Sequence, residues 1–253
     1  MKIVADLHTH TMASGHAYST IMENICVAKE KGMQFLGVSE HAPALDDAPQ
    51  ESFFGNLKVI RKDWDALHVL HGAELNILNE YGDVDLSVET LHKLDYAIAS
   101  LHYPVFPKER LSRCTDAAIA AMSNPNVFIL GHPDDDLMPL DYKALTHAAK
   151  HFHVALEVNN SSLCPGSFRM GAAENYHKML KLAKNLEAPV IVSSDSHICY
   201  DVGNFTRALS LLDKLNFPKE LVVNSSRLRL LDFLTSKMNA AKPANGKPLP
   251  IAV

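Results

Sequence analysis

Short runs of apolar residues alternate with amphipathic stretches along almost the whole chain. Several of these runs are near-continuous and lack the alternation of polar and apolar positions that marks a strand exposed on one face. Near-continuous runs are typical of parallel strands that helices cover on both faces. We therefore predict seven strands, over residues 2–8, 35–41, 69–75, 96–102, 127–133, 154–160 and 189–197.

Between the predicted strands, Leu, Ala and Met recur at helical spacing. Thr20 and Glu23 form a capping box at the start of one such stretch, and Gly32 follows its end. Asp141 is a suitable N-cap for another stretch. The predicted helices cover residues 20–32, 141–152, 173–186 and 204–216, and the irregular segment 42–68 is predicted to be an active-site loop plus a helix.

Seven β/α units in a parallel pattern predict a single α/β domain with a closed or nearly closed β/α barrel. An open, doubly wound sheet is the alternative, but that fold usually has a glycine-rich first turn. The first turn here has the sequence HTHTMASG, so the barrel is favoured. No linker or repeat divides the chain. We assign residues 1–240 to the domain and residues 241–253, rich in Pro, Ala and Lys, to an extended C-terminal tail.

The composition is ordinary for a globular protein, with 47% hydrophobic and 21% charged residues and a formal net charge of -5. The mild acidic excess argues against nucleic acid or an anionic membrane as a partner. We see no signal peptide and no run long enough to cross a membrane. The four scattered cysteines fit reduced thiols. We therefore expect a cytoplasmic protein and leave open whether it forms a homo-oligomer.

Histidines gather where the predicted strands end. Ligands of α/β proteins bind at the C-terminal ends of the strands, and five of the seven predicted ends carry histidine. Histidine is only 14 of 253 residues, so chance would place roughly one there. The polar residues at these ends are His8, His10, Glu40, His41, Glu74, His102, His132, Asn159, Asn160, Asp195 and His197.

Together, neutral imidazoles and carboxylates bind divalent metals such as Zn²⁺, Mn²⁺ or Fe²⁺. In extended His8-x-His10 both side chains project to the same side of the backbone, about 7 Å apart. Glu74 interrupts an apolar strand end and, if buried, needs a cation. Taken singly, each residue also has a simpler interpretation, such as a turn, a core histidine or, for Asp195, a helix cap. Seven further histidines are assigned to surface or packing roles: His68, His71, His92, His147, His151, His153 and His177.

Six short motifs resemble those of the PHP (polymerase and histidinol phosphatase) superfamily, and they occur in the same order. The branch that the chain resembles most is the YcdX-like phosphatases, small stand-alone PHP proteins. The motifs are DLHTH at 6–10, SEHA at 39–42, GAE at 72–74, SLH at 100–102, GHPD at 131–134 and SSDSH at 193–197. The resemblance implies a distorted (β/α)7 barrel, a PHP metal-dependent hydrolase domain over residues 1–240, and a trinuclear metal centre. Zinc is the expected metal, with Mn²⁺ or Fe²⁺ as alternatives.

The resemblance also implies a ligand set, and every position has the expected residue type. The first metal would be held by His8, His10, Glu74 and Asp195, the second by His16, His41 and His197, and the third by His102 and His132, with Glu74 bridging to the first. Catalytic roles are expected for Glu74, Asp195 and His197. Candidates for binding a phosphate group are Lys108, Arg110, Arg113 and Arg169, although a solvated surface charge is the simpler interpretation of each.

Clustered divalent ions suit phosphoester hydrolysis, because two metals about 3.5–4 Å apart can lower the pKa of a shared water. We therefore expect hydrolysis of a small phosphomonoester by a metal-bound hydroxide. A binuclear amidohydrolase or deaminase is the alternative, but such enzymes usually present a lysine at the end of the fourth strand, where this chain has SLH. Within the superfamily, a histidinol phosphatase remains open, and a nuclease is disfavoured because no basic groove is visible. A metal-binding regulatory protein without turnover is a further alternative.

Overall fold

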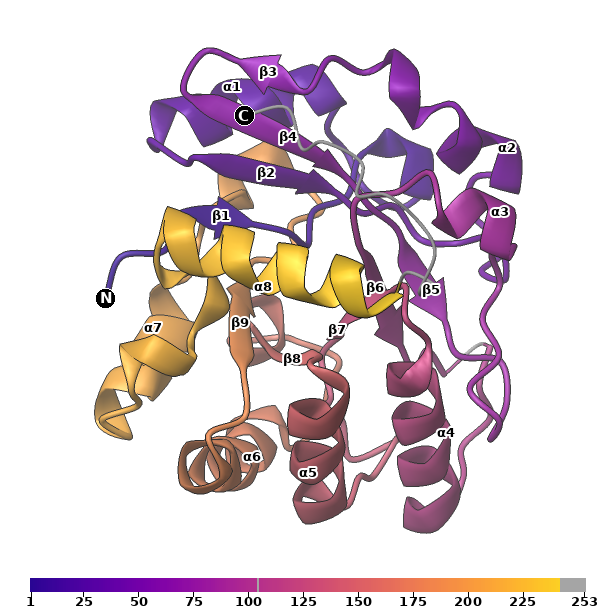
Figure 1. Ribbon diagram of the computed structural model, residues 1–253, viewed down its shortest axis with the longest axis vertical. Helices are drawn as coiled ribbons and strands as arrows, with labels where there is room; N and C mark the ends of the chain where they lie inside the picture. Colours follow the sequence, from indigo (N-terminus) through magenta and orange to yellow (C-terminus); the bar gives the residue numbers. More distant parts are fainter. Residues whose placement is uncertain (104, 242–253) are drawn as a thin grey trace.

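The computed structural model describes residues 1–103 and 105–241, and its strands form two sheets (Figure 1). One sheet has the order β1-β2-β4-β3 and the other β5-β6-β7-β8-β9. All neighbours are parallel except β3, which is antiparallel to β4. The strands are β1 (Ala5–Asp6), β2 (Phe35–Val38), β3 (Asp63–Trp64), β4 (Leu67–His71), β5 (Glu74–Asn76), β6 (Ala97–Ser100), β7 (Val127–Leu130), β8 (Ala155–Asn159) and β9 (Val190–Ser193).

Two isolated bridges connect the sheets. Thr9, after β1, pairs with Ser196, after β9, and His41, after β2, pairs with Glu74 at the start of β5. The run predicted as one strand over 69–75 is interrupted between β4 and β5, and its two halves pair with β2 and β6 respectively. The seven predicted parallel strands are therefore present in the order of a distorted β/α barrel, and single bridges rather than continuous ladders join the sheets.

Helices surround the strands, and the four predicted from periodicity are all observed. Thr20 and Glu23 make the expected capping box, and Asp141 caps its helix by accepting from two backbone N–H groups. The helices are α1 (Ile21–Glu30), α2 (Glu51–Gly55), α3 (Val88–Leu91), α4 (Leu111–Ser123), α5 (Tyr142–Phe152), α6 (Ala172–Leu186), α7 (Thr206–Lys214) and α8 (Arg227–Ala241). Short 3-10 turns are η1 (Met12–Ser14), η2 (Leu57–Val59), η3 (Ser161–Leu163), η4 (Cys199–Asp201), η5 (Lys219–Leu221) and η6 (Val223–Ser225).

The apolar core has two parts. The larger lies between the sheets and the outer helices, and the smaller lies among strand residues that face α8. In Figure 1, α8 crosses in front of the strands, and Leu230, Phe233 and Leu234 of this helix join the smaller cluster. Ala241 ends α8, and the rest of the predicted tail, 242–253, lies outside the described residues.

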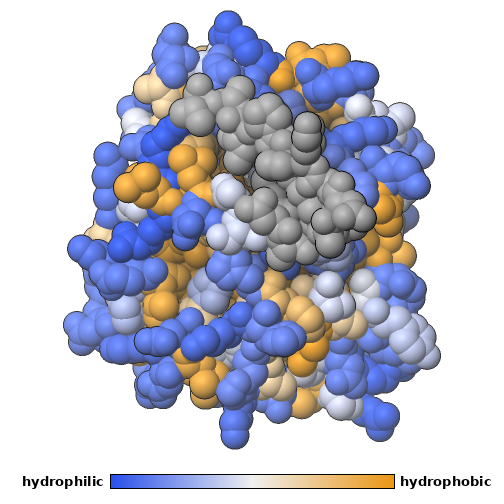
Figure 2. Space-filling model, viewed as in Figure 1, coloured by the Kyte–Doolittle hydropathy of each residue, from blue (hydrophilic) through white to orange (hydrophobic). Residues whose placement is uncertain are grey.

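The surface shown in Figure 2 is mixed in hydropathy, and the cysteines form no disulfide among the described residues. On the face shown in Figure 2, hydrophobic residues are scattered among hydrophilic ones. No helix in the described ranges is long and apolar enough to span a bilayer. Cys26, Cys114, Cys164 and Cys199 are all free thiols.

One buried tyrosine ties β1 to β6. The Tyr96 hydroxyl donates to the Leu7 carbonyl at 2.6 Å, and the ring fills the space where side chains at Gly37 and Gly72 would stand. We expect Tyr96→Phe to lose about 2 kcal/mol, because the buried carbonyl loses its partner. The melting temperature should fall by about 4–8 °C. A thermal melt checks this against Tyr81→Phe, whose side chain is exposed; equal melts for both variants would contradict the expectation.

Candidate metal centre

The candidate ligands come from separate segments that follow, or begin, neighbouring parallel strands. Parallel strands end at one edge, so side chains that follow them meet there; Glu74 does so because it comes shortly after β4 as well as at the start of β5. Two of the residues have left-handed backbone, His132 with φ of 26° and Asp195 with φ of 54°. Such conformations are uncommon outside glycine and cluster at functional sites. His8 and His10 follow β1, His41 follows β2, Glu74 begins β5, His102 follows β6, His132 follows β7, and Asp195 and His197 follow β9.

Glu74 is at the centre of the cluster, fully buried, with both carboxylate oxygens facing imidazoles. Its Oε1 lies 2.8 Å from His132 Nε2 and 3.2 Å from His102 Nε2. The Ser100 hydroxyl also donates to Oε1, at 2.7 Å. Its Oε2 lies 2.7 Å from His41 Nδ1, and 3.2 Å and 3.5 Å from the Nε2 atoms of His8 and His10. A carboxylate that faces five imidazoles has the geometry of a bridging ligand.

Asp195 provides the second carboxylate. Its Oδ1 lies 3.3 Å from His10 Nε2, 3.5 Å from His8 Nε2 and 3.6 Å from His197 Nδ1. The other oxygen, Oδ2, accepts from Asn159 Nδ2 at 2.9 Å. The same oxygen accepts from Arg169 Nη1 at 3.1 Å. Asp195 therefore contacts both His8 and His10, which follow β1, and Arg169. Arg169 is the only arginine among the described residues that line the adjoining cavity.

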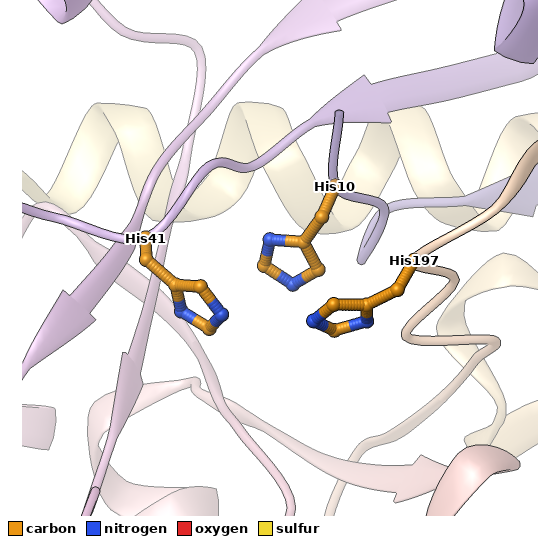
Figure 3. Close-up of side chains that lie close together, drawn as sticks. All are labelled: His10, His41 and His197. Atoms are coloured by element: carbon orange, nitrogen blue, oxygen red, sulfur yellow. The ribbon is translucent and has the colours of Figure 1, made fainter. Parts of the chain in front are cut away.

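His10, His41 and His197 point toward one another from three different segments (Figure 3). Their ligand atoms lie within 4.8 Å of one another, as do those of three further groups: His8 with His132 and Asp195, His8 with His10 and Glu74, and His41 with Glu74 and His102. His16 belongs to none of these four groups. Its ring is more exposed and stacks on His41 and His197, with centroids 5.0 and 4.9 Å apart. The structure thus brings together all nine predicted ligands, with His16 at the rim.

Several buried polar atoms at the centre lack a hydrogen-bond partner. Their position and chemistry show whether these residues suit a cation. They are His8 Nε2, His10 Nε2, His41 Nδ1, His102 Nε2 and Glu74 Oε2. His41 Nδ1 and Glu74 Oε2 approach to 2.7 Å without hydrogen-bond alignment. Unsatisfied buried polar atoms are costly, and these five converge on one spot. Nitrogen and carboxylate donors in this arrangement fit borderline divalent ions.

Electrostatics leaves two of the histidines neutral. Burial lowers the pKa of His10 well below its usual range, and the neighbouring charges of His41 and His197 lower it further. Burial also lowers the pKa of His132 to about 4. Both imidazoles are therefore deprotonated at neutral pH and offer a lone pair, which is the form that binds metal.

The pKa values of His8, Glu74 and Asp195 shift in the directions that keep these three groups charged. Burial by itself lowers the pKa of His8, but the charges of Glu157, Glu74 and Asp195 outweigh burial and raise that pKa well above the usual value. Burial by itself raises the pKa values of Glu74 and Asp195, yet the surrounding histidines hold both well below the usual range. The anionic carboxylates thus hold a proton on His8, and a metal cation can take the place of that proton.

A cavity of about 690 Å³ opens beside the centre, lined by His16, His41, His102, His132, Asp195 and His197 on one side. The Arg169 side chain is largely buried there and is also held by the Ser162 hydroxyl at 3.0 Å. Lys108 and Arg110 are not among the described residues that line this cavity. Lys108 stacks on Tyr103, and Arg113 pairs with Glu80 and Glu109. Of the predicted phosphate-gripping residues, the structure brings only Arg169 to the centre.

Comparison with known proteins agrees with this architecture. The PHP domain family model matches residues 6–161. A protein of Caldanaerobacter subterraneus described as a probable phosphatase is 42% identical over 238 residues, which cover 94% of this chain and 93% of that protein. A probable phosphatase of Shewanella amazonensis is 41% identical, with 94% of each chain covered. The chain belongs to the PHP domain family.

Solved structures that resemble this PHP domain show the same fold at low sequence identity. Histidinol phosphate phosphatase of Lactococcus lactis, crystallised with zinc, L-histidinol and phosphate, has a TM-score of 0.58 at 16% identity; the match covers 85% of this chain and 94% of that one. A chain of an archaeal ribonuclease P bound to mature tRNA has a TM-score of 0.53 at 19% identity, covering 94% and 90%. At such identities these likenesses concern the fold alone.

A second layer of polar residues orients the histidines of this PHP domain, and none of these residues is among the nine ligands predicted from the sequence. Glu157 accepts from His8 Nδ1 at 2.7 Å and, through its other oxygen, from the His132 backbone N–H at 2.7 Å. The side-chain oxygen Oδ1 of Asn76 lies 2.7 Å from His102 Nδ1. Each contact turns the opposite ring nitrogen toward the centre, as outer partners of metal-binding histidines commonly do.

Glu40 supports the first histidines more indirectly. Its carboxylate accepts from the Thr11 and Ser14 hydroxyls, both at 2.6 Å. The Ser14 oxygen is 3.3 Å from His10 Nδ1 and accepts from the His41 backbone N–H. A signal for this layer is present in the sequence: Asn76, Glu157 and Glu40 are polar residues inside or at the end of otherwise apolar strands.

We expect Glu157→Gln to weaken binding of the divalent metal by about 10–100-fold, because His8 loses the carboxylate that fixes its orientation. Competition with a chelating dye, on protein stripped of metal and titrated with Zn²⁺, measures the change. Glu174→Gln, on the exposed face of α6, is the matched control. Affinity within twofold of the wild type would show that Glu157 does not position His8 for metal.

Proposed function

We propose that this PHP domain is a metal-dependent phosphatase that hydrolyses a small phosphomonoester at a trinuclear centre. Zinc is the first choice of metal, and Mn²⁺ or Fe²⁺ are alternatives that the same ligands accept. The observation that carries the proposal is the buried Glu74 carboxylate facing five imidazoles, several of whose ring nitrogens lack hydrogen bonds. Buried nitrogens and carboxylate oxygens without hydrogen-bond partners are costly, and cations bound among them would remove that cost.

The proposed ligands divide among three ions. His8, His10, Glu74 and Asp195 would hold the first, His16, His41 and His197 the second, and His102 and His132 the third with Glu74 shared. His10 lies close enough to His41 and His197 to serve the second ion as well. When bound, divalent ions lower the pKa of a coordinated water and offset the charge of a phosphate.

Side chains of this protein would bind the phosphate and hold the metal ligands in position. Arg169, fixed by Asp195 and Ser162, presents its guanidinium to the cavity and would bind and orient a phosphate. Asp195 and Glu74 hold the histidines in place, and His197, less buried than either, lines the cavity where a substrate would lie. Catalytic roles for Glu74, Asp195 and His197 are part of this proposal.

The relatives described as probable phosphatases support the reaction class, since they match nearly the full length of this chain. The zinc and phosphate in the Lactococcus lactis enzyme support the same chemistry on the same fold. A nuclease is the weaker candidate, because Arg169 is the only lysine or arginine among the described residues lining the cavity.

An activity assay with controlled metal content tests the proposal. Protein stripped by a chelator should release no phosphate from 4-nitrophenyl phosphate, and Zn²⁺ or Mn²⁺ should restore turnover. A phosphodiester and an amide such as dihydroorotate, assayed in parallel, should remain intact. Hydrolysis of the amide but not the phosphate would favour the amidohydrolase alternative and contradict the proposal, as would metal uptake without any turnover.

A further inference from the structure

The cavity beside the metal centre has a second, apolar wall that the phosphatase proposal does not use. Leu101 and Leu130 lie at or just after the ends of β6 and β7, Met138 and Leu140 lie in the segment before α5, and Ala118 lies on α4. Four of these five are nearly inaccessible and belong to the main apolar core. Leu45, Leu137 and Ile198 line the same cavity and, like Leu101, are half-buried, so these residues present the apolar surface that a ligand can reach, and the core packs behind them.

The volume of about 690 Å³ is far larger than a phosphate group requires. It falls in the range of pockets that enclose an organic ligand, about 300–1,000 Å³. Water in an apolar chamber finds few hydrogen-bond partners, so an apolar group gains affinity by displacing it. If the phosphate group binds at the histidines and Arg169, the alcohol portion of the ester, which is the leaving group, lies against the apolar wall.

Charge restricts that alcohol further. Asp134, Asp135 and Asp201 line the cavity, and Asp135 and Asp201 are half-buried, within reach of a ligand. Among the described lining residues, only Arg169 is a lysine or arginine, and it already faces Asp195. With the metal ions and Arg169 engaged by the first phosphate, a second phosphate or a carboxylate on the substrate would meet these acidic side chains, and no other lysine or arginine is among the described lining residues.

We infer that the natural substrates are phosphomonoesters of uncharged alcohols that carry an apolar body, about the size of a butyl or phenyl group. This inference rests on the proposed phosphatase function and specifies its substrate class. Phe168 and Tyr103, two exposed aromatic residues at the rim of the same cavity, are placed to cover such a group once it enters.

A homologous series of esters tests the inference on the full-length, Zn²⁺-loaded protein. The value of kcat/KM should rise about 4-fold per methylene from ethyl to butyl phosphate, the factor expected for burying one methylene. Hexyl phosphate carrying a terminal carboxylate should be at least about 10-fold poorer than hexyl phosphate itself. A flat series, or equal rates for the charged and uncharged hexyl esters, would overturn the inference.

Variants that fill the chamber provide the matched test. Leu137→Phe, at a half-buried lining position, should remove the rise with chain length, and Leu137→Trp should do so more completely. Leu228→Asn, exposed on α8 and outside the cavity lining, should keep the full rise. A rise that persists in both filled variants would show that the apolar body binds elsewhere.

Binding of the free alcohol separates this inference from the phosphatase proposal. In metal-stripped protein, hexan-1-ol but not glycerol should shift the methyl NMR signal of Met138, assigned with a Met138→Leu variant. If the metal-loaded protein hydrolyses no ester but this signal shifts, the chamber stands and the phosphatase proposal fails. If esters are hydrolysed and the signal does not shift, the chamber does not receive the alcohol and this inference fails.

Discussion

Glu74→Gln is expected to lower kcat/KM for a phosphomonoester by at least about 10³-fold. Glutamine keeps the size of the side chain but replaces an anionic oxygen with an amide. The oxygens of Glu74 face five imidazoles, so the change should weaken binding of all ions that share the carboxylate. Steady-state kinetics at saturating Zn²⁺ measures the loss, and metal analysis of the same samples shows whether it follows metal content.

The exposed Glu174→Gln serves as the control for charge removal and should match the wild type in both assays. Circular dichroism and a thermal melt establish that the Glu74→Gln barrel is folded. A folded Glu74→Gln protein with metal content and turnover close to wild type would remove Glu74 from the centre and with it the bridging arrangement.

Arg169→Met is expected to lower kcat/KM by about 10²-fold, with most of the change in KM. The guanidinium is buried against Asp195 and is the only arginine or lysine among the described residues that line the cavity. A charge-assisted hydrogen bond to phosphate contributes about 1.5–3 kcal/mol, which corresponds to this loss. Arg169→Lys should recover only part, because lysine lacks the planar fork that bonds two oxygens at once.

Arg110→Met is the matched control, since Arg110 is exposed and lies outside the cavity lining. Product inhibition by inorganic phosphate adds a binding readout: the inhibition constant should weaken in Arg169→Met and stay unchanged in Arg110→Met. Equal losses in the two variants would mean that net charge near the mouth, rather than a fixed guanidinium, attracts the substrate.

Most of the fold follows from local sequence signals. The near-continuous apolar runs identify the parallel strands because both faces of each strand are covered, and the capping box at Thr20 and the cap at Asp141 mark helix starts. α4 is not among the helices predicted from the sequence, because its N-cap residue, Arg110, is no capping residue type and makes no side-chain cap. The interruption between β4 and β5 was also missed, because it arises from pairing with β2 on one side and β6 on the other.

The candidate ligands were predictable because parallel strands end at a common edge, so residues far apart in sequence meet there. Which residues orient those ligands was not predictable to the same extent. Glu157 sits within an apolar strand just as Glu74 does, but only its contacts with His8 and the His132 backbone reveal its role. The sequence also gave no reason to prefer Arg169 over Lys108 or Arg110, because burial against Asp195 depends on how the loop after β8 folds.

Metal content per chain, determined by plasma mass spectrometry on protein purified without an affinity tag or chelator, distinguishes a trinuclear centre from its alternatives. We expect about three divalent ions per chain in the wild type, because the proposed ligands are divided among three ions. Glu74→Gln should hold markedly fewer. A value near two would favour a binuclear hydrolase. A value near zero that stays there after Zn²⁺ or Mn²⁺ is added would contradict the claim that these histidines and carboxylates form a metal centre.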